Sequence, residues 1–512
     1  MVNRKKMVCG YLFLVLLIFI PPMLRGQESP PRIDVILWFD TEDYILPASD
    51  DAALRLANWL TEHKIQATFK VVGEKARTLE RRGRTDVIEA LKKHEIGYHS
   101  NWHSVPPTPA QYLNACGWAD GVAEFTRREK PGYDDVARIF GQKPSCYGQP
   151  GSSWAPQSHA ALHQWGMRIY LDAGSHVNVE DKPFWYGGLL NFYKLNHQIR
   201  VGINYPHELE EAKIKFLQAR DQLISEGGGV ISIVYHPCEF VHQQFWDGVN
   251  FKNGANPPRE QWKLPPTKTE AQSKLAYHNF EEYVLFMQRF PGVQFVTATQ
   301  AAAMYPDKAR KVNWTNLEVE KLALASSSDF HLKGIHWVKA NDLILSPAEF
   351  FWLCTMAVDQ KFDKESSREL IISKALPELI AGPDRTPAKE VTKTLDLTRL
   401  DVERAVSQVK DYLMTHHQIP PEIWIGSQAV TPERYLLEMV TTLDYRAQAR
   451  GKPFRIIQLL SREPLFLSSR YVADNGTNLW KWVIFPQSFS APNVMAQARL
   501  QAWNLKPAVR SK

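Results

Sequence analysis

Cysteine is scarce in this chain of 512 residues, with five copies and no C-x-x-C pair. The spacing of a zinc knuckle is therefore absent. Cys9 lies in the N-terminal segment, and four cysteines follow it: Cys116, Cys146, Cys238 and Cys354. An oxidising compartment would permit a disulfide among these four, but the sequence selects no pairing, and buried free thiols are the alternative.

An excess of charge of one sign is also lacking. Lysine and arginine number 61, aspartate and glutamate number 55, and the net charge is only +6. Nucleic-acid-binding proteins concentrate positive charge on one surface, so we expect no nucleic-acid partner. With 44% hydrophobic and 23% charged residues, the chain has the composition of a folded protein. Its length exceeds what one ordinary core accommodates, which predicts two domains.

Long hydrophobic runs are missing outside the N-terminus. There, Arg4, Lys5 and Lys6 precede an apolar run over residues 11–20, and this order is typical of a secretory signal peptide. The run is shorter than the ~20 residues that span a bilayer. We therefore predict that residues 1–26 are a cleaved signal peptide, with an uncleaved anchor as the alternative. The mature protein is expected to be secreted or periplasmic, in the cell envelope, without a stable membrane span.

Strand-like and helix-like segments alternate from residue 32 to residue 308. Apolar strands are expected at 33–39, 67–73, 95–99, 167–171, 229–235 and 293–296. Between them are segments whose apolar residues have helical spacing, as at 53–60 and 86–93. This alternation predicts an α/β fold with a parallel sheet or a (β/α) barrel. Catalytic residues of such barrels follow the carboxyl ends of the strands.

From about residue 313 the pattern becomes mainly helical, as in 347–358 and 402–414. The segments 346–350 and 431–435 each place a hydroxyl residue before a proline, the pattern of a capped helix start. We therefore predict a mainly helical second domain over 313–512, with an internal duplication suggested by these two segments.

Titratable residues follow several of the predicted strands directly. They are Asp40, Glu42 and Asp43 after the first strand, His99 and His103 after the third, Asp172 after 167–171 and His236 after 229–235. Histidines at an i, i+4 spacing on a helical turn face one ion. Two histidines and one carboxylate leave ligand positions open, as in catalytic metal sites. Each feature alone has an ordinary structural explanation, but their common place at strand ends favours a single site.

These motifs resemble those of the polysaccharide deacetylases, carbohydrate esterase family four with the NodB-homology domain. The segment 39–43 (FDTED) is similar to the family's first motif, and 67–73 (ATFKVVG) to its ATFFVVG-like strand. The segment 94–103 (HEIGYHSNWH) matches the metal-binding motif HEIG-x-H-[ST]-x-x-H, and 234–237 (VYHP) matches L-x-H-P. The resemblance covers roughly 32–305 and implies a distorted (β/α) barrel, a divalent metal ion expected to be Zn²⁺, and hydrolysis of N-acetyl or, less often, O-acetyl groups.

By position, the resemblance makes Asp40 the general base that takes a proton from water. His99 and His103 would bind the metal together with one carboxylate, Glu42 or Asp43. Glu42 is favoured because a residue two positions along an extended strand points to the same side as Asp40. Asp43 remains the alternative.

The resemblance also makes His236 the general acid, with Asp172 orienting it. The family's third motif usually carries an arginine two residues before a proline, where it supports the base. In this chain Gly148 takes that place, and Gln149 is expected to hydrogen-bond Asp40 without supplying charge. A changed pKa of the base and a changed substrate are therefore expected.

The segment between His236 and Phe280 is rich in aromatic residues, which either pack on each other or form a wall of the substrate groove. We assign Gln149, Tyr147 and Trp246 to substrate binding. The predicted function is a secreted metal-dependent deacetylase acting on a glycan such as peptidoglycan or an exopolysaccharide. The alternatives are an amidohydrolase of the same scaffold that acts on a small amide or imide, and a non-catalytic glycan-binding protein.

The C-terminal region is similar, over 409–436, to the pseudomurein-binding repeat. That similarity implies attachment to a wall polymer, and a generic helical appendage is the alternative. Nothing in the sequence sets the oligomeric state.

Overall fold

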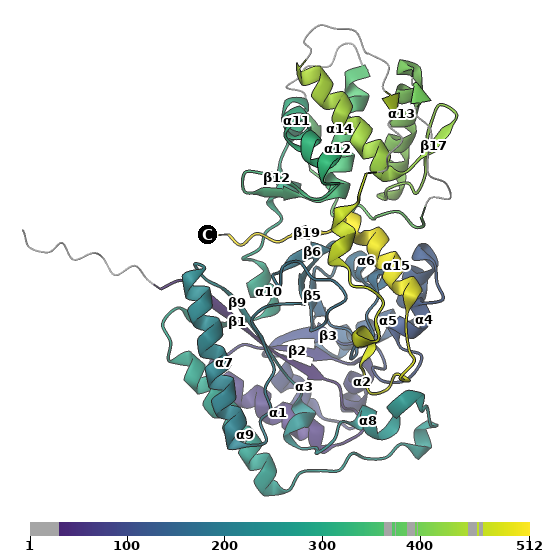
Figure 1. Cartoon of the computed structure of the whole chain (residues 1–512). Coiled ribbons are helices and arrows are strands. Elements are labelled where there is room, and N and C mark those ends of the chain that lie inside the picture. The colour runs from purple at the N-terminus through teal and green to yellow at the C-terminus, as the bar shows by residue number, and fades with distance from the viewer. Residues whose placement is uncertain are drawn as a thin grey trace, which may run out of the picture.

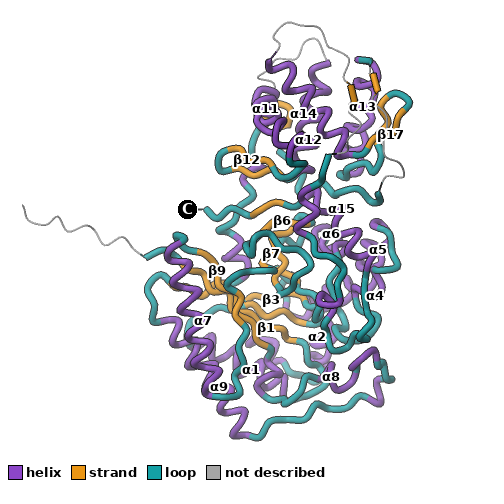
Figure 2. Tube along the Cα trace, viewed as in Figure 1, coloured by secondary structure: helices purple, strands orange, loops and turns teal. Residues whose placement is uncertain are grey.

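A computed structural model describes residues 30–362, 371–373, 375–386, 395–396, 398–448, 458–459 and 464–511 (Figures 1 and 2). The predicted signal peptide, residues 1–26, lies outside these residues. Within them, no helix combines the length and the apolar composition needed to cross a bilayer. Among the described cysteines, Cys116, Cys146 and Cys238 are free thiols.

A curved sheet of 11 strands forms the centre of the larger unit. Its strands are β1 (Ile33–Thr41), β2 (Thr68–Val71), β3 (Glu95–Tyr98), β4 (Cys146–Tyr147), β5 (Ile169–Leu171), β6 (Phe184–Tyr186), β7 (Leu189–Phe192), β8 (Gln198–Ile199), β9 (Gly229–Tyr235), β10 (Val293–Val296) and β19 (Lys506–Pro507). The order is β19-β6-β7-β5-β4-β3-β2-β1-β9-β8, with β10 paired to β1. Only the two pairings of β6 are antiparallel. This sheet is the distorted (β/α) barrel that the sequence predicts.

Helices cover the outside of the sheet (Figure 2). They are α1 (Ala48–Glu62), α2 (Gly73–Arg81), α3 (Thr85–Leu91), α4 (Pro109–Leu113), α5 (Trp118–Phe140), α6 (Pro156–Gln164), α7 (Pro206–Ser225), α8 (Trp246–Asn250), α9 (Glu270–Gln288) and α10 (Ala298–Ala302), with 3₁₀ turns η1 (Pro237–Phe240), η2 (Lys252–Gly254) and η3 (Arg259–Gln261). All nine residues of β1 are buried, because a central parallel strand is covered on both faces. The six strands expected from apolar runs are all present as β1, β2, β3, β5, β9 and β10.

The helical unit above the barrel in Figure 1 repeats one order of elements, helix, hairpin, helix. The first copy holds α11 (Asn316–Leu332), β12 (Val338–Ala340), β13 (Leu343–Leu345) and α12 (Pro347–Phe362), and the second holds α13 (Arg399–His416), β16 (Ile423–Ile425), β17 (Gln428–Val430) and α14 (Pro432–Gln448). Thr315 and Thr398 cap the first helix of each copy. The similarity between the segments 346–350 and 431–435 therefore extends over both halves of the helical unit.

Short elements flank the two helical copies. They are η4 (Lys308–Lys311), β11 (Trp314–Thr315) paired with β14 (Ile371–Ser373), and β15 (Leu395–Asp396) paired with β18 (Gln458–Leu459).

Residues 464–511 differ from the predicted second domain over 313–512, because they return to the barrel (yellow in Figure 1). This C-terminal segment contains η5 (Leu467–Tyr471), η6 (Thr477–Trp480), α15 (Pro492–Leu500) and η7 (Gln501–Asn504), and ends in β19. Strand β19 joins the main sheet beside β6, and apolar residues such as Trp480, Phe485 and Met495 belong to the barrel's core. Irregular turns carry no hydrophobic period, so the sequence pattern did not indicate where this segment packs.

Candidate active site

The carboxyl ends of neighbouring parallel strands bring the predicted site residues together. Asp40 lies near the end of β1, His99 directly follows β3, and His236 directly follows β9. Strand β1 pairs with both β2 and β9, and β2 pairs with β3. These residues, separated by up to almost 200 positions, therefore share one edge of the sheet.

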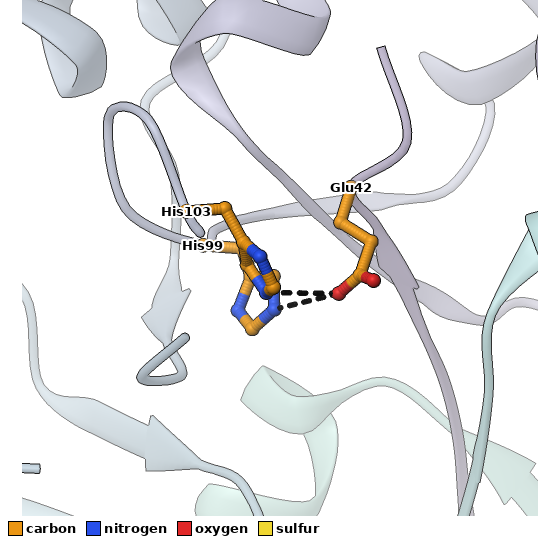
Figure 3. Close-up of side chains that lie close together, drawn as sticks. All are labelled: Glu42, His99 and His103. Atoms are coloured by element: carbon orange, nitrogen blue, oxygen red, sulfur yellow. Dashed lines mark ion pairs between the residues drawn. The ribbon is translucent and has the colours of Figure 1, made fainter. Parts of the chain in front are cut away.

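Glu42, His99 and His103 form a buried cluster whose ligand atoms all lie within 4.8 Å of one another (Figure 3). Oε2 of Glu42 is 2.9 Å from Nε2 of His103 and 3.6 Å from Nε2 of His99. Burial raises the pKa of Glu42, but the facing histidines more than reverse this and lower it well below its usual value. Glu42 is therefore held as an anion.

The donor set fits a divalent cation. Nδ1 of His99 donates to the backbone oxygen of Gly148 at 3.0 Å, which leaves the Nε2 lone pair free. Nδ1 of His103 lies 2.6 Å from Oγ of Ser104. Nε2 of His103 is buried and, apart from its 2.9 Å approach to Oε2 of Glu42, has no polar partner among the described residues. Two imidazoles and one carboxylate facing one point, with further positions open, are the donors of a catalytic zinc-type site.

The loop that carries the two histidines is not the helical turn expected from their spacing. Residues 101–103 form bends and turns, and Ser100 and His103 have φ values of 66° and 54°. Non-glycine residues rarely adopt such backbone angles, and they occur where surrounding structure holds a functional group in place. Glu129 on α5 helps to do so, because it accepts the backbone N–H of Asn101 at 2.7 Å.

Asp43, the alternative carboxylate ligand, points elsewhere. Its Oδ1 accepts the backbone N–H groups of Ile45 and Leu46 at 2.9 and 3.0 Å. Its other neighbours are the buried side chains of Cys238 and His242. Burial raises the pKa of Asp43 to about 6. Glu42 is thus the carboxylate that the structure brings to the two histidines.

Lys70 supplies a cation that we did not predict from the sequence. It lies in β2 with no exposed side-chain surface, and its Nζ is 3.0 Å from Oδ1 of Asp40. The same ammonium donates to Oδ2 of Asp172 at 3.0 Å and to the oxygen of Leu171 at 2.8 Å. Burial alone would lower the pKa of Lys70, but the two carboxylates raise it above its usual value. A lysine inside an otherwise apolar strand was the available sequence signal.

The Asp40 carboxylate is ionised by this environment. Burial raises its pKa, but His99 and Lys70 more than compensate and lower it below its usual value. Its Oδ1 is 3.5 Å from Nε2 of His99, which places it next to the cluster.

Gly148 leaves the space that Lys70 occupies. A Cβ atom at this position would lie 1.9 Å from Nζ of Lys70. The family resemblance would put an arginine side chain at position 148. In this chain the Lys70 ammonium, which comes from β2, fills that space instead. The predicted hydrogen bond from Gln149 to Asp40 is wrong, because Gln149 accepts from the Tyr170 hydroxyl and donates to backbone oxygens.

His236 approaches the cluster from the end of β9, the strand next to β1. Its Nε2 is 3.7 Å from Oδ2 of Asp40 and 3.8 Å from Oε2 of Glu42. Burial and Arg200 lower the pKa of His236, but Glu239, 3.3 Å from Nδ1, and Glu42 together outweigh them, and the net pKa is raised. The prediction that Asp172 orients this histidine is wrong, since Asp172 binds Lys70 instead.

Glu239 is the carboxylate that orients His236, and our reading of the sequence missed it. Burial raises the pKa of Glu239, but Arg200, paired with it, and His236 lower it to about 2. The sequence feature that could have indicated this role is the position of Glu239, three residues after the histidine in His-Pro-Cys-Glu.

The cluster opens into a chamber of about 560 Å³. It is lined by Asp40, Glu42, His99, His103, Gln149, Asp172, Arg200, His236, Phe245, Asp247, Trp482 and Val483, among others. Of the predicted substrate-binding residues, only Gln149 reaches it. Tyr147 is buried against Tyr98 and Tyr170, and Trp246 is buried against Tyr44. Both assignments are wrong, because large aromatic side chains of this region fill the core.

No family model and no curated protein matches this chain. It is similar to solved structures of polysaccharide deacetylases, the family whose motifs it resembles. A protein assigned as a polysaccharide deacetylase from Mycobacterium smegmatis is 15% identical, with a TM-score of 0.36, and the match covers 54% of this chain and 91% of that chain. The peptidoglycan deacetylase PdaC from Bacillus subtilis is 16% identical, with a TM-score of 0.26 and coverages of 53% and 91%.

PuuE allantoinase is 12% identical, with a TM-score of 0.34 and coverages of 53% and 90%. At these identities and TM-scores the similarities carry no weight for function.

Proposed function

We propose that this chain is a metal-dependent deacetylase that hydrolyses N-acetyl, or O-acetyl, groups on a glycan such as peptidoglycan or an exopolysaccharide. The observation that carries the proposal is the convergence of a carboxylate base, a three-residue ligand set and an imidazole in one chamber. A divalent cation held by Glu42, His99 and His103, proposed to be Zn²⁺, would act as a Lewis acid that lowers the pKa of water and polarises a carbonyl.

Asp40 is the base in this proposal. Lys70 and His99 keep its carboxylate ionised, as a general base requires. Asp40 takes a proton from the water molecule whose oxygen forms a bond to the acetyl carbon. Because Lys70 binds one oxygen of this carboxylate, its orientation toward the chamber is fixed.

His236 is the acid. The nearby Glu239 anion favours the imidazolium form, so His236 carries a proton that it can donate. As the bond from the acetyl carbon to nitrogen breaks, His236 transfers this proton to the departing nitrogen. The products are acetate and an amino sugar, and the proton held by Asp40 can return His236 to its starting form through water.

A carbohydrate substrate is supported by aromatic side chains next to the chamber. A second cavity of about 640 Å³ shares His103 with the chamber and is lined by Trp102, Tyr112 and Trp262. The Trp102 side chain is 40% exposed, a large exposed fraction for tryptophan. Flat apolar surface of this kind, with polar groups at its edge, suits the faces of sugar rings.

Export is supported by the N-terminal sequence, and the repeat-like helical unit supports attachment to a wall polymer. Tethering of this kind would raise the local concentration of substrate.

The test uses the chain without residues 1–26, purified and analysed for its metal content. Acetate release is then measured with N-acetylated chitooligosaccharides, peptidoglycan, acetylated exopolysaccharide and small cyclic amides. We expect about one divalent ion per chain, release from a glycan, and no release by Asp40→Asn. Glu210→Gln, on the surface of α7, serves as the control.

Each alternative has its own outcome. Hydrolysis of the small amides without glycan deacetylation would replace the proposal by the amidohydrolase function. Glycan binding with neither a metal nor hydrolysis would leave a binding protein.

A further inference from the structure

The C-terminal segment, residues 464–511, contributes directly to the chamber. Trp482 and Val483 line it together with the proposed catalytic residues. The Trp482 ring packs edge-on against His103, with ring centroids 5.2 Å apart. Its Nε1 donates to Oδ2 of Asp247, another lining residue, at 2.7 Å. This tryptophan is therefore part of the wall beside a proposed metal ligand.

Gly151 provides room for this ring. A Cβ atom at position 151 would lie 2.2 Å from the indole of Trp482, and Gly151 has a φ of 51°. Only glycine lacks the side chain that would meet the ring, and the backbone angle also favours glycine. The barrel is thus shaped to receive a residue that lies more than 300 positions away in the sequence.

The segment is anchored on both sides of Trp482. Backbone N–H groups of Asn253 and Gly254 donate to the oxygens of Val483 and Ile484 at 3.0 and 2.8 Å. Trp480 packs against His176 with ring centroids 4.9 Å apart. Such contacts hold the loop in one position, so that the wall is preformed rather than mobile.

The place of Trp482 in the chamber suggests its role. If His236 protonates the departing nitrogen, the sugar lies toward His236, and the acyl group lies toward the other side. Trp482 packs on His103, whereas the ring packed against His236 is that of Phe245. The indole is thus placed to meet the end of the acyl chain.

We propose that the C-terminal segment completes the reaction chamber and that Trp482 is a specificity-determining residue, which limits the acyl group to acetyl. This inference rests on the proposed function. A rigid ring selects against added methylene groups by steric exclusion, and one methylene changes relative rates by about 10-fold or more.

The experiment compares Trp482→Ala and Trp482→Phe with the unaltered chain. The rates kcat/KM are measured for chitooligosaccharides carrying N-acetyl, N-propionyl and N-butyryl groups. Trp482→Ala should raise the butyryl-to-acetyl ratio about 10-fold or more, and Trp482→Phe, which retains a ring, should raise it less. Ile214→Ala, a change at an exposed apolar residue of α7, should leave the ratio unchanged.

A binding measurement separates this inference from the proposed function. Acetohydroxamate and butyrohydroxamate bind to protein-held divalent cations without being hydrolysed, so their affinities for the metal-loaded protein are measured by calorimetry. Trp482→Ala should shift the preference toward butyrohydroxamate even if no glycan is deacetylated. Unchanged chain-length preference of a folded Trp482→Ala protein in both assays would overturn the inference and leave the deacetylase proposal standing. Lack of hydroxamate binding by the unaltered chain would overturn it as well.

Discussion

Asp40 and Lys70 are direct neighbours in the parallel ladder between β1 and β2, and their charged groups lie 3.0 Å apart. The register places both side chains on the same face of the sheet, inside the barrel. The base and the cation that supports it therefore come from two adjacent strands. The pairing has consequences for catalysis and for stability.

Lys70→Met should lower kcat about 100-fold. This is the lower end of the rate gain that a general base typically contributes. Without the ammonium, burial raises the pKa of Asp40, so activity at acidic pH should be lost at a higher pH than in the unaltered enzyme. The pH profile of kcat/KM measures this shift. Lys92→Met, at the surface, is the control, and an unchanged acidic limb in Lys70→Met would contradict the proposed role.

Gly148→Ala should reduce both activity and stability. The added methyl group would meet the Lys70 ammonium at 1.9 Å and the backbone oxygen of Leu171 at 2.8 Å. Overpacking of this kind costs about 1–3 kcal/mol, which thermal or urea unfolding measures. Gly117→Ala is the matched control because nothing lies within 4 Å of that position. Equal effects of the two changes would contradict the requirement for glycine at 148.

Ser104→Ala should weaken metal binding about 10-fold while leaving the three ligands in place. The Ser104 hydroxyl lies 2.6 Å from Nδ1 of His103 and orients the ring. Loss of such outer partners costs about 10- to 100-fold in affinity. Competition with a chelator of known affinity gives the dissociation constant. Ser225→Ala, an exposed change in α7, should leave it unaltered.

Glu239→Gln should move the alkaline limit of activity to lower pH. Glu239 counteracts the effect of burial and raises the pKa of His236, so the acid stays protonated to a higher pH than usual. Neutral glutamine removes that effect, the pKa of His236 falls, and activity is lost earlier as pH rises. The alkaline limb of kcat/KM is the measurement, with Glu210→Gln as the surface control. An alkaline limb at the same pH in Glu239→Gln and in the unaltered enzyme would show that another group donates the proton.

Glu129→Gln should flatten the dependence of stability on pH. Burial raises the pKa of Glu129 from 4.5 to about 7 in the folded state. Its stabilising contribution is therefore complete below about pH 4.5 and is lost as pH rises through about 7, a difference of about 3 kcal/mol. Gln keeps an oxygen for the bonds from Asn101 and Tyr98 but does not ionise.

Urea unfolding of Glu129→Gln at pH 4.5, 6 and 8 tests this prediction. Glu226→Gln, at the exposed end of α7, is the control. A decrease in the free energy of unfolding above pH 6 that is as steep in Glu129→Gln as in the unaltered chain would show that another group causes it.

Several parts of the site could be predicted because they depend on local sequence. His99 and His103 lie four positions apart directly after an apolar strand, and Glu42 follows the first strand in the same way. Parallel strands in one sheet bring such residues to a common edge whatever the details of packing. The choice between Glu42 and Asp43, by contrast, depended on where the chain turns after β1, since Asp43 caps that turn.

Other residues could not be assigned from the sequence. Trp246 lies in an aromatic-rich segment, as a substrate-binding residue would, but it is buried. Apolar composition predicts burial and ligand contact equally well, because both remove aromatic surface from water. Glu239 and Asp172 are both acidic, and only their distances to His236 and Lys70 separate their roles.

The sequence by itself determined the class of fold, six of the strands of the sheet and the ligand-bearing loops at their ends. These follow from hydrophobic periodicity and from residues close together in the chain. Only the tertiary structure decided that Lys70 stands beside Asp40, that Glu239 orients His236, and that Trp482 closes the chamber from the C-terminal end. Such contacts are set by side-chain packing and by the register of distant segments, and neither leaves a period in the sequence.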